Sequence, residues 1–524
     1  MTLLATLARV EAAASGRAQP LATVRHRHLA EHPMVFVPLT TAGEAGAPLG
    51  ALVGTDPAAP TLLTVPQPRD RDLRFRFLAE LADVLLPHLE SAQDAVETVP
   101  RRSGEAAERC VDAPQLVVPN AGGVAFVRLL GRSMRFRRTA EEDPDAPHPA
   151  PARVPLLGRW LTHYGERARV PGSALLLSAT ELLTRHWATG QSPLEDQHLG
   201  ALLAWLRAAE ADVPGRDGGD GRDGGDGRDG GGGAAGARAA LRAETERDAE
   251  GLLRTPPAGP ATDPAFDNQR LAPAVARYDA GVFGAEAEIR TLLATQLRPT
   301  WDAVWEALER VRALPPGERV AARWEGDRWS YTAHRDRLRA GEPPQPRRDD
   351  AVTAARKLAA RERDQARLSA QEALDDPLVL AGRRLAGEAF AGEVTAVEEA
   401  YSTGRRPMPR PLVTVRTGDE PQLAVGTKVY RVLPGDGRTQ GGECAALPGP
   451  GLVTVRLTGG MGRGAQPAAG SVPVAGDTVC WTLFEHQPRG GPDLPDPEDT
   501  PWTHGGPPAG GPEEPDRATG EDLL

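Results

Sequence analysis

Three histidines, His26, His28 and His32, stand close together just before the first expected β-strand, and clustered imidazoles can bind zinc. The spacing is H-x-H-x-x-x-H, and the zinc site of a hydrolase is one interpretation of it. The other is a solvated loop, which we favour because the cluster precedes a strand, whereas the hydrolase pattern needs its ligands after one. The sequence therefore predicts neither a metal site nor a cofactor here.

A second chemical pattern is a run of arginines at residues 128–138, with Phe126, Met134 and Phe136 interleaved. Arginines can follow a phosphate backbone while aromatic rings stack on bases, so nucleic-acid binding is one interpretation. The alternative is a strand or short helix whose apolar side lies in the core and whose arginines pair with the acidic residues 141–143. We favour this alternative because the acidic residues follow directly. The arginines are Arg128, Arg132, Arg135, Arg137 and Arg138.

Lysine is almost absent, since only Lys357 and Lys428 occur among 61 basic residues, as is typical of a high-GC bacterium. A phosphate-binding P-loop needs a glycine followed directly by a lysine that neutralises the terminal phosphates. Neither lysine follows a glycine, so this chain cannot hydrolyse ATP through a P-loop. Arginine keeps its proton in proteins, which removes most Schiff-base and general-base candidates as well. The sequence predicts no catalytic residues and favours a protein that is not an enzyme.

Length and charge limit the architecture that could carry these residues. The 524 residues suffice for about three or four domains. A net charge of −11 argues against a protein that coats DNA with its whole surface, but it is compatible with a local basic face. Residues 489–524 contain nine carboxylates and two arginines among many glycines and prolines. Such a segment buries too little apolar area to offset its ordering entropy, so we expect a disordered acidic tail.

The apolar pattern predicts an α+β multidomain protein. Residues 1–98 are expected to form a small α+β domain, and residues 112–210 a mostly helical domain with an N-terminal strand. A Gly/Arg/Asp repeat at 211–237 predicts a flexible linker. Residues 238–345 are expected to be a helical domain, with tryptophans at a spacing that favours a core over base stacking. The expected helices include 71–91, 156–168, 172–187, 193–208, 285–297 and 299–314.

The C-terminal part combines a long helix with short strands. Residues 350–390 are rich in helix formers, and Asp376 followed by Pro377 can cap a second helix, which predicts a helical hairpin stalk. Alternating apolar and polar residues then predict a small antiparallel β-barrel over 391–488. Its five expected strands are 392–397, 412–417, 427–432, 451–457 and 477–484.

This stalk and barrel carry G-E-V-T-A-V in the first strand, R-P-L-V-T-V-R in the second and G-D-T-V-C-W at the end. With these motifs, residues 350–488 resemble the 1B region of superfamily 1 helicases of the Upf1-like group, without the motor domains. In such helicases the barrel lies over the nucleic acid. The resemblance therefore implies a partner motor that is encoded separately.

The same resemblance implies which barrel residues touch phosphate. These are Arg405, Arg406 and Arg410 in a barrel loop and Arg416 in a strand. The alternative is a solvated loop, and the local charge adds little to either view, because residues 347–431 contain 15 basic and 13 acidic side chains.

Two functions fit these features. The first is a non-catalytic adaptor, an accessory subunit that acts with a separately encoded helicase or ATPase and contacts single-stranded nucleic acid through its barrel. The second is a protein–protein scaffold that binds no nucleic acid. Because the N-terminus resembles no signal sequence and no apolar stretch has membrane-spanning length, we expect a cytoplasmic protein without membrane contact.

Overall fold

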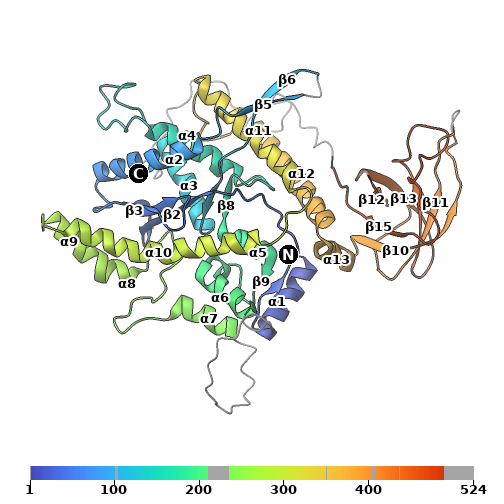
Figure 1. Ribbon diagram of the computed structural model, residues 1–524, viewed down its shortest axis with the longest axis horizontal. Coiled ribbons are helices and arrows are strands. Elements are labelled where there is room, and N and C mark those ends of the chain that lie inside the picture. Colours follow the sequence, from blue (N-terminus) through green and yellow to red (C-terminus); the bar gives the residue numbers. More distant parts are fainter. Residues whose placement is uncertain are drawn as a thin grey trace, which may run out of the picture. The chain divides into compact units, whose positions relative to one another are not determined.

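The computed structural model describes residues 2–100, 104–210, 235–349, 351–403, 407–435 and 437–488, which form two compact units (Figure 1). The sheet unit comprises Ala8–Pro20 and Arg25–Arg361, and the barrel unit comprises the described parts of Met1–Leu7, Leu21–Val24 and Glu362–Pro492. Helices and strands occur in both, which confirms the expected α+β multidomain class. Residues 211–234 of the expected linker and the expected tail at 489–524 lie outside the described residues.

A mixed five-stranded sheet in the order β4-β3-β2-β7-β8 lies at the centre of the sheet unit. The last three strands in this order run parallel, whereas β3 and β4 are antiparallel to their neighbours. Strand β2 is buried along almost its whole length, which requires cover on both faces. The strands are β2 (Met34–Thr41), β3 (Glu44–Gly54), β4 (Thr61–Thr64), β7 (Leu116–Val118) and β8 (Leu176–Ser178).

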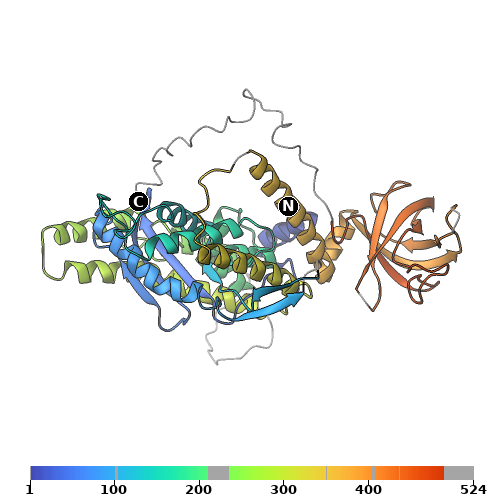
Figure 2. The same ribbon diagram turned by 90° about the horizontal axis from the view of Figure 1, so that it is seen from above.

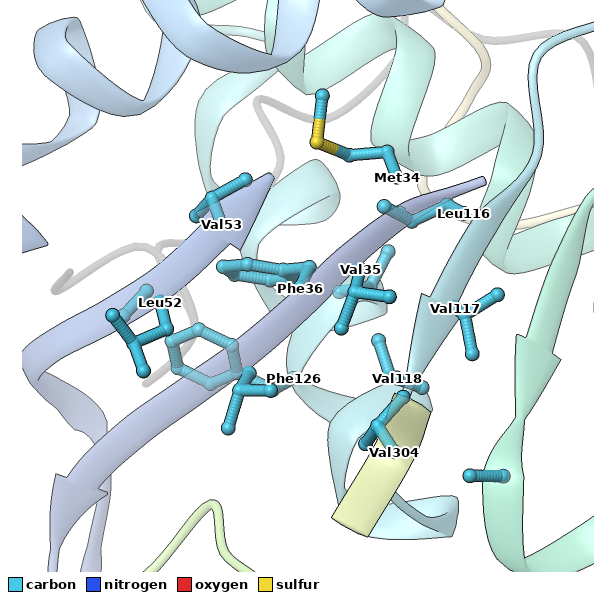
Figure 3. Packing of buried hydrophobic residues seen from close by; sticks show 14 of the residues in the cluster. Met34, Val35, Phe36, Leu52, Val53, Leu116, Val117, Val118, Phe126 and Val304 are labelled. Atoms are coloured by element: carbon cyan, nitrogen blue, oxygen red, sulfur yellow. The ribbon is translucent and has the colours of Figure 1, made fainter. Parts of the chain in front are cut away.

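Helices from three parts of the chain provide this cover. Helix α2 (Arg71–Leu89) contacts β3 and β4, α3 (Ala121–Met134) contacts β2, β7 and β8, and α10 (Ala285–Arg312) contacts β2, β3 and β4. Figure 3 shows the resulting core, in which the rings of Phe36 on β2 and Phe126 on α3 have centroids 6.3 Å apart.

Three segments that the sequence treated as separate domains therefore share one hydrophobic core. Strands from 1–98 and 112–210 lie in the same sheet, and helices of 238–345 pack on it. The physical reason is that β7 and β8 are only three residues long, too short to be stable as a pair. Pairing β7 with β2 gives both strands a sheet large enough to be covered.

Helix α10 is one continuous helix of 28 residues, whereas the sequence predicted two helices separated at Pro299. A proline inside a helix costs about 3 kcal/mol, because it removes a hydrogen bond and crowds the preceding turn. Burying a large apolar side chain contributes about 1.5–3 kcal/mol, so a stripe of them outweighs that cost. The stripe continues on both sides of the proline and comprises Ile289, Leu293, Leu297, Trp301, Val304 and Leu308.

The expected helix 172–187 is in fact β8 followed by α5 (Ala179–His186). An apolar run such as Leu175–Leu177 does not distinguish a buried strand from a helix by periodicity, and pairing with β7 decides for the strand. Ser178 then accepts a hydrogen bond from the backbone of Glu181 and starts the helix. The other main elements of this unit are β5 (Val96–Pro100), β6 (Ala106–Cys110), α4 (Val154–Arg167), α6 (Leu199–Glu210), α7 (Ala235–Thr245), α9 (Ala272–Asp279) and α11 (Val320–Arg339).

In the barrel unit, six antiparallel strands close in the order β10-β11-β14-β13-β12-β15. Figure 2 shows this barrel, drawn in orange tones, in a second view. The sequence predicted five of them and missed β13, whose glycines and proline hide a strand signal. Helix α12 (Ala351–Asp375) enters this unit, and Asp376 caps α13 (Pro377–Leu385) as predicted, accepting a hydrogen bond from the backbone of Leu378 at 2.9 Å. The strands are β10 (Ala389–Glu398), β11 (Leu412–Thr417), β12 (Lys428–Val432), β13 (Thr439–Gly449), β14 (Leu452–Leu457) and β15 (Thr478–Thr482).

Inward-facing residues of the barrel alternate with outward-facing ones. Val413 and Val415 of β11 and Val453 and Val455 of β14 are buried, whereas the hydroxyls of neighbouring threonines meet on the outer side. This is the alternation that the sequence predicted for a half-buried strand. Among the described helices, none combines the length and the apolar character needed to cross a bilayer.

Candidate anion-binding site

The four arginines predicted to contact phosphate are not gathered into one site by the described part of the barrel. Arg405 and Arg406 lie outside the described residues. Arg410 is half-buried and donates from Nη1 to the backbone oxygen of Thr458 at 2.6 Å, so it holds its own loop to the chain beyond β14. Arg416 is exposed on β11, about 20 Å further along the chain at 3.3 Å per residue.

Exposed cations on the barrel strands stand opposite carboxylates. Arg416 is in register with Glu393, and both Lys428 and Arg456 are in register with Glu443. Directly opposed residues on antiparallel strands have Cβ atoms about 4.5–5.5 Å apart, so opposite charges there offset each other. These three positions leave little excess positive charge on the barrel.

A strongly basic hollow lies instead in the sheet unit, where α3, α4, Gln345–Asp349 and the start of α12 meet. Its volume is about 390 Å³. Among the residues that the structure describes, seven cationic and two anionic side chains line it, a formal net charge of +5 in a protein whose total is −11. We call it the arginine cradle. Its cations are Arg128, Arg132, Arg135, Arg169, Arg347, Lys357 and Arg361, and its carboxylates are Glu166 and Asp349.

Helix α3 supplies the first wall of the cradle. Arg128 and Arg132 are four residues apart and share one face of the helix, whereas Phe126 and Met134 are buried in the core. This confirms the predicted helix with an apolar side. The expected pairing with the acidic patch is seen for Arg138, which lies 3.4 Å from Asp143, while the arginines nearer the start of the run line the cradle.

Helix α4 forms the second wall of the cradle, and its close packing against α3 brings Arg128 and Arg132 beside it. Glycines make it possible: a Cβ at Gly158 would lie 2.4 Å from the backbone nitrogen of Arg135, and one at Gly165 would lie 2.5 Å from Cγ of Arg128. A Cβ at Gly131 would likewise meet the α4 backbone at 2.5 Å. Any larger residue at these positions would push the helices apart and open the hollow.

Arg135 fixes the third wall, which begins at Gln345, to α3. Arg135 is only 3% exposed. Its Nε donates to the backbone oxygen of Gln345 at 2.9 Å, and its Nη2 donates to that of Pro346 at 3.4 Å. The guanidinium carbons of Arg135 and Arg347 lie 4.6 and 5.1 Å from the ring centre of Phe136. These contacts hold Arg347 and the start of α12 beside α3.

The two carboxylates each engage cations of the cradle. Asp349 contacts Nζ of Lys357 at 2.5 Å, and Glu166 lies 3.2 Å from Arg361 and 3.9 Å from Arg169. Partly exposed ion pairs of this kind contribute at most about 1 kcal/mol, so an incoming phosphate can compete for the same donors. Arg128, Arg132, Arg135 and Arg347 also line the hollow.

The N-terminal histidine cluster does not converge on a common point. His26 stacks on His186 with ring centroids 5.9 Å apart, His28 stacks on Trp324 at 4.1 Å, and His32 points its exposed ring to solvent. The three imidazoles thus have three different environments.

Sequence reasoning found only the α3 part of the cradle. Arg169, Arg347, Lys357 and Arg361 are separated by up to 192 residues and carry no shared motif, so no local signal joins them. The chain matches no protein-family model, no curated protein and no solved structure.

Proposed function

We propose that this protein is a non-catalytic nucleic-acid-binding adaptor that makes its principal phosphate contacts in the arginine cradle. The observation that carries the proposal is the cradle's excess of five positive charges within an otherwise acidic protein. Cations that neutralise phosphates release condensed counterions, which is the main source of affinity for nucleic acid. Guanidinium groups also match phosphate oxygens with two parallel hydrogen bonds.

An aromatic ring beside the cradle favours a single-stranded ligand. Phe136 is 39% exposed and carries the guanidinium groups of Arg135 and Arg347 against its ring. Exposed rings and guanidinium planes offer stacking surfaces for unpaired bases, which a duplex keeps inside its helix. The barrel then acts as a second module with a weaker contribution through Arg416 and the loop that contains Arg405, Arg406 and Arg410.

The partner in this proposal is a separately encoded helicase or ATPase. The chain has no glycine–lysine pair and hence no P-loop of its own, and its C-terminal part resembles a helicase region that modulates the grip on nucleic acid. Stimulation of such a motor's nucleic-acid-dependent ATPase activity by the full chain is the expected readout.

The test is salt-dependent binding to a fluorescent 20-nucleotide single strand. For single strands, log K falls with log salt with a slope of about −0.7 per phosphate contacted, so three or four contacts predict a slope of about −2 to −3. Fluorescence anisotropy between about 50 and 200 mM salt measures it. Absence of binding at the lowest salt contradicts the proposal.

One observation favours the alternative, a protein–protein scaffold. Phe283 is fully exposed in the turn between α9 and α10, next to Val282, which is 49% exposed. Exposed aromatic residues are typical anchors of protein interfaces. If scaffolding is the function, F283A weakens binding of the partner, while charge changes in the cradle leave it unchanged.

A further inference from the structure

We infer that the arginine cradle receives a terminal phosphate group, the end of a nucleic-acid strand or of a nucleotide, in preference to an internal phosphodiester. The inference rests on the proposed function in one respect, that phosphate contacts are made in the cradle. It adds the kind of phosphate group that binds there.

The shape of the cradle is the first reason. Residues of α3, α4, Gln345–Asp349 and the start of α12 line a hollow of about 390 Å³. Arg135 lines this hollow although only 3% of the residue is exposed, so a ligand reaches it only by entering. An internal phosphodiester carries a sugar on both sides and runs along a surface. A terminal phosphate has one ester bond and can enter end-on.

The concentration of charge is the second reason. At pH 7 a phosphate monoester carries a charge of about −1.5 to −2 and presents three acceptor oxygens, whereas an internal diester carries one negative charge. Seven cationic residues line one small volume in the cradle instead of being spread along a track. Arg361 is only 24% exposed, and a partly buried cation gains most from a ligand whose charge is compact.

The volume of the hollow is the third reason. A volume of about 390 Å³ lies within the range of about 300–1,000 Å³ typical of small-molecule sites, and it exceeds what one phosphate fills. Arg347 lines the hollow, and its guanidinium group, which lies over the ring of Phe136, offers a planar surface on which the first base can stack. The cradle thus fits a terminal phosphate together with its nucleoside.

The experiment compares two 20-nucleotide single strands of identical sequence, one with a 5′-phosphate and one with a 5′-hydroxyl, both labelled at the 3′ end. We expect the phosphorylated strand to bind at least about tenfold more tightly, which corresponds to about 1.4 kcal/mol. R132Q, a mild change at an exposed arginine of α3, should reduce this preference, and R290Q, the same change at an exposed arginine of α10 that does not line the cradle, should leave it unchanged. A 3′-phosphorylated strand, inorganic pyrophosphate and a nucleoside triphosphate serve as competitors and identify the source of the phosphate.

The outcomes separate this inference from the proposed function. Equal, salt-dependent binding of both strands, without competition by any of the terminal phosphates, overturns the inference and leaves the adaptor proposal standing. Competition or direct binding by pyrophosphate or the triphosphate, with no binding of either strand, supports the inference and overturns nucleic-acid binding. Preference for the phosphorylated strand that survives in R132Q and in the double variant R128E/R132E would falsify the assignment to the cradle.

Discussion

The barrel and the arginine cradle are both rich in arginine, yet they arrange their charges in opposite ways. On the barrel strands, Arg416 faces Glu393 across the sheet and Arg456 faces Glu443. In the cradle, seven cations surround two carboxylates. The number of arginines along a segment therefore says little about anion binding, because the neighbours in space decide how much positive charge remains.

The two arrangements also differ in what they do to stability. Opposed charges on neighbouring strands contribute roughly 0.2–1 kcal/mol per pair to the barrel. A cluster of like charges destabilises the folded state through self-repulsion, and an anion offsets this. Binding of an anion should therefore stabilise the sheet unit, whose folding brings the cradle together.

The largest expected effect is a difference between charge reversals in the two regions. R128E/R132E places two carboxylates on one wall of the cradle, and we expect it to lower the affinity for single-stranded DNA about hundredfold, or about 2.7 kcal/mol. R410E/R416E in the barrel should change it by less than about threefold. Anisotropy at constant salt measures both, with circular dichroism as a check on folding. The reverse ranking would restore the barrel as the principal interface.

The next effect concerns the approach of α3 to α4. G158A places a Cβ 2.4 Å from the backbone nitrogen of Arg135, and we expect it to destabilise the protein by about 1–3 kcal/mol and to weaken anion binding. G326A is the matched control, because no atom lies within 4 Å of its new Cβ on α11. It should stabilise by about 0.5–1 kcal/mol. Urea unfolding compares the two, and equal stabilities would contradict the close packing.

A third prediction concerns pH and the sheet unit. His163 of α4 and His334 of α11 are buried and stacked with ring centroids 4.3 Å apart. Burial lowers the pKa of His334 to about 3, and burial with the neighbouring His334 and Arg167 holds the pKa of His163 well below its usual value. Both rings are therefore neutral in the folded state, whereas the unfolded chain takes up protons below pH 6.5 or so.

The two neutral histidines should therefore not reduce the free energy of unfolding above about pH 6.5. This free energy should fall as the pH drops from there toward their pKa values in the folded state. Between pH 7.5 and 5.5 each histidine should remove about 1.4 kcal/mol from the free energy of unfolding. H334F should remove about 1.4 kcal/mol of the total loss, to which other buried histidines such as His186 also contribute, and H32Q, at an exposed histidine, should leave the loss intact. Thermal melts at the two pH values measure it, and an undiminished loss in H334F contradicts this origin.

The smallest expected effect is on the affinity of the barrel for nucleic acid when its carboxylates are removed. E393Q/E443Q removes the carboxylates that stand opposite Arg416, Lys428 and Arg456. If these carboxylates are what keeps the barrel from binding phosphate, the affinity for single strands should rise about two- to fivefold, or less than about 1 kcal/mol. An unchanged affinity would show that the barrel surface does not reach the nucleic acid.

Elements whose signal is local were predicted from the sequence. Helix α2, helix α12 and the cap at Asp376 follow from helix formers and capping residues, and β11 matches the predicted strand residue for residue. Elements that depend on a neighbouring strand or on the surrounding core were missed or misassigned. Strand β13 exists because β14 and β12 lie on either side of it, and α10 continues through Pro299 because the core buries both halves.

The sequence by itself determined that this chain has no P-loop, that its net charge is negative, and that a helical region precedes a small barrel. Only the tertiary structure decided that the first two segments share one sheet covered by helices of the third, and that Arg128, Arg169, Arg347 and Arg361 line one hollow. The physical reason is the range of the forces involved. Periodicity and capping act over a few residues, whereas close packing and charge neutralisation depend on distances in space that no local pattern records.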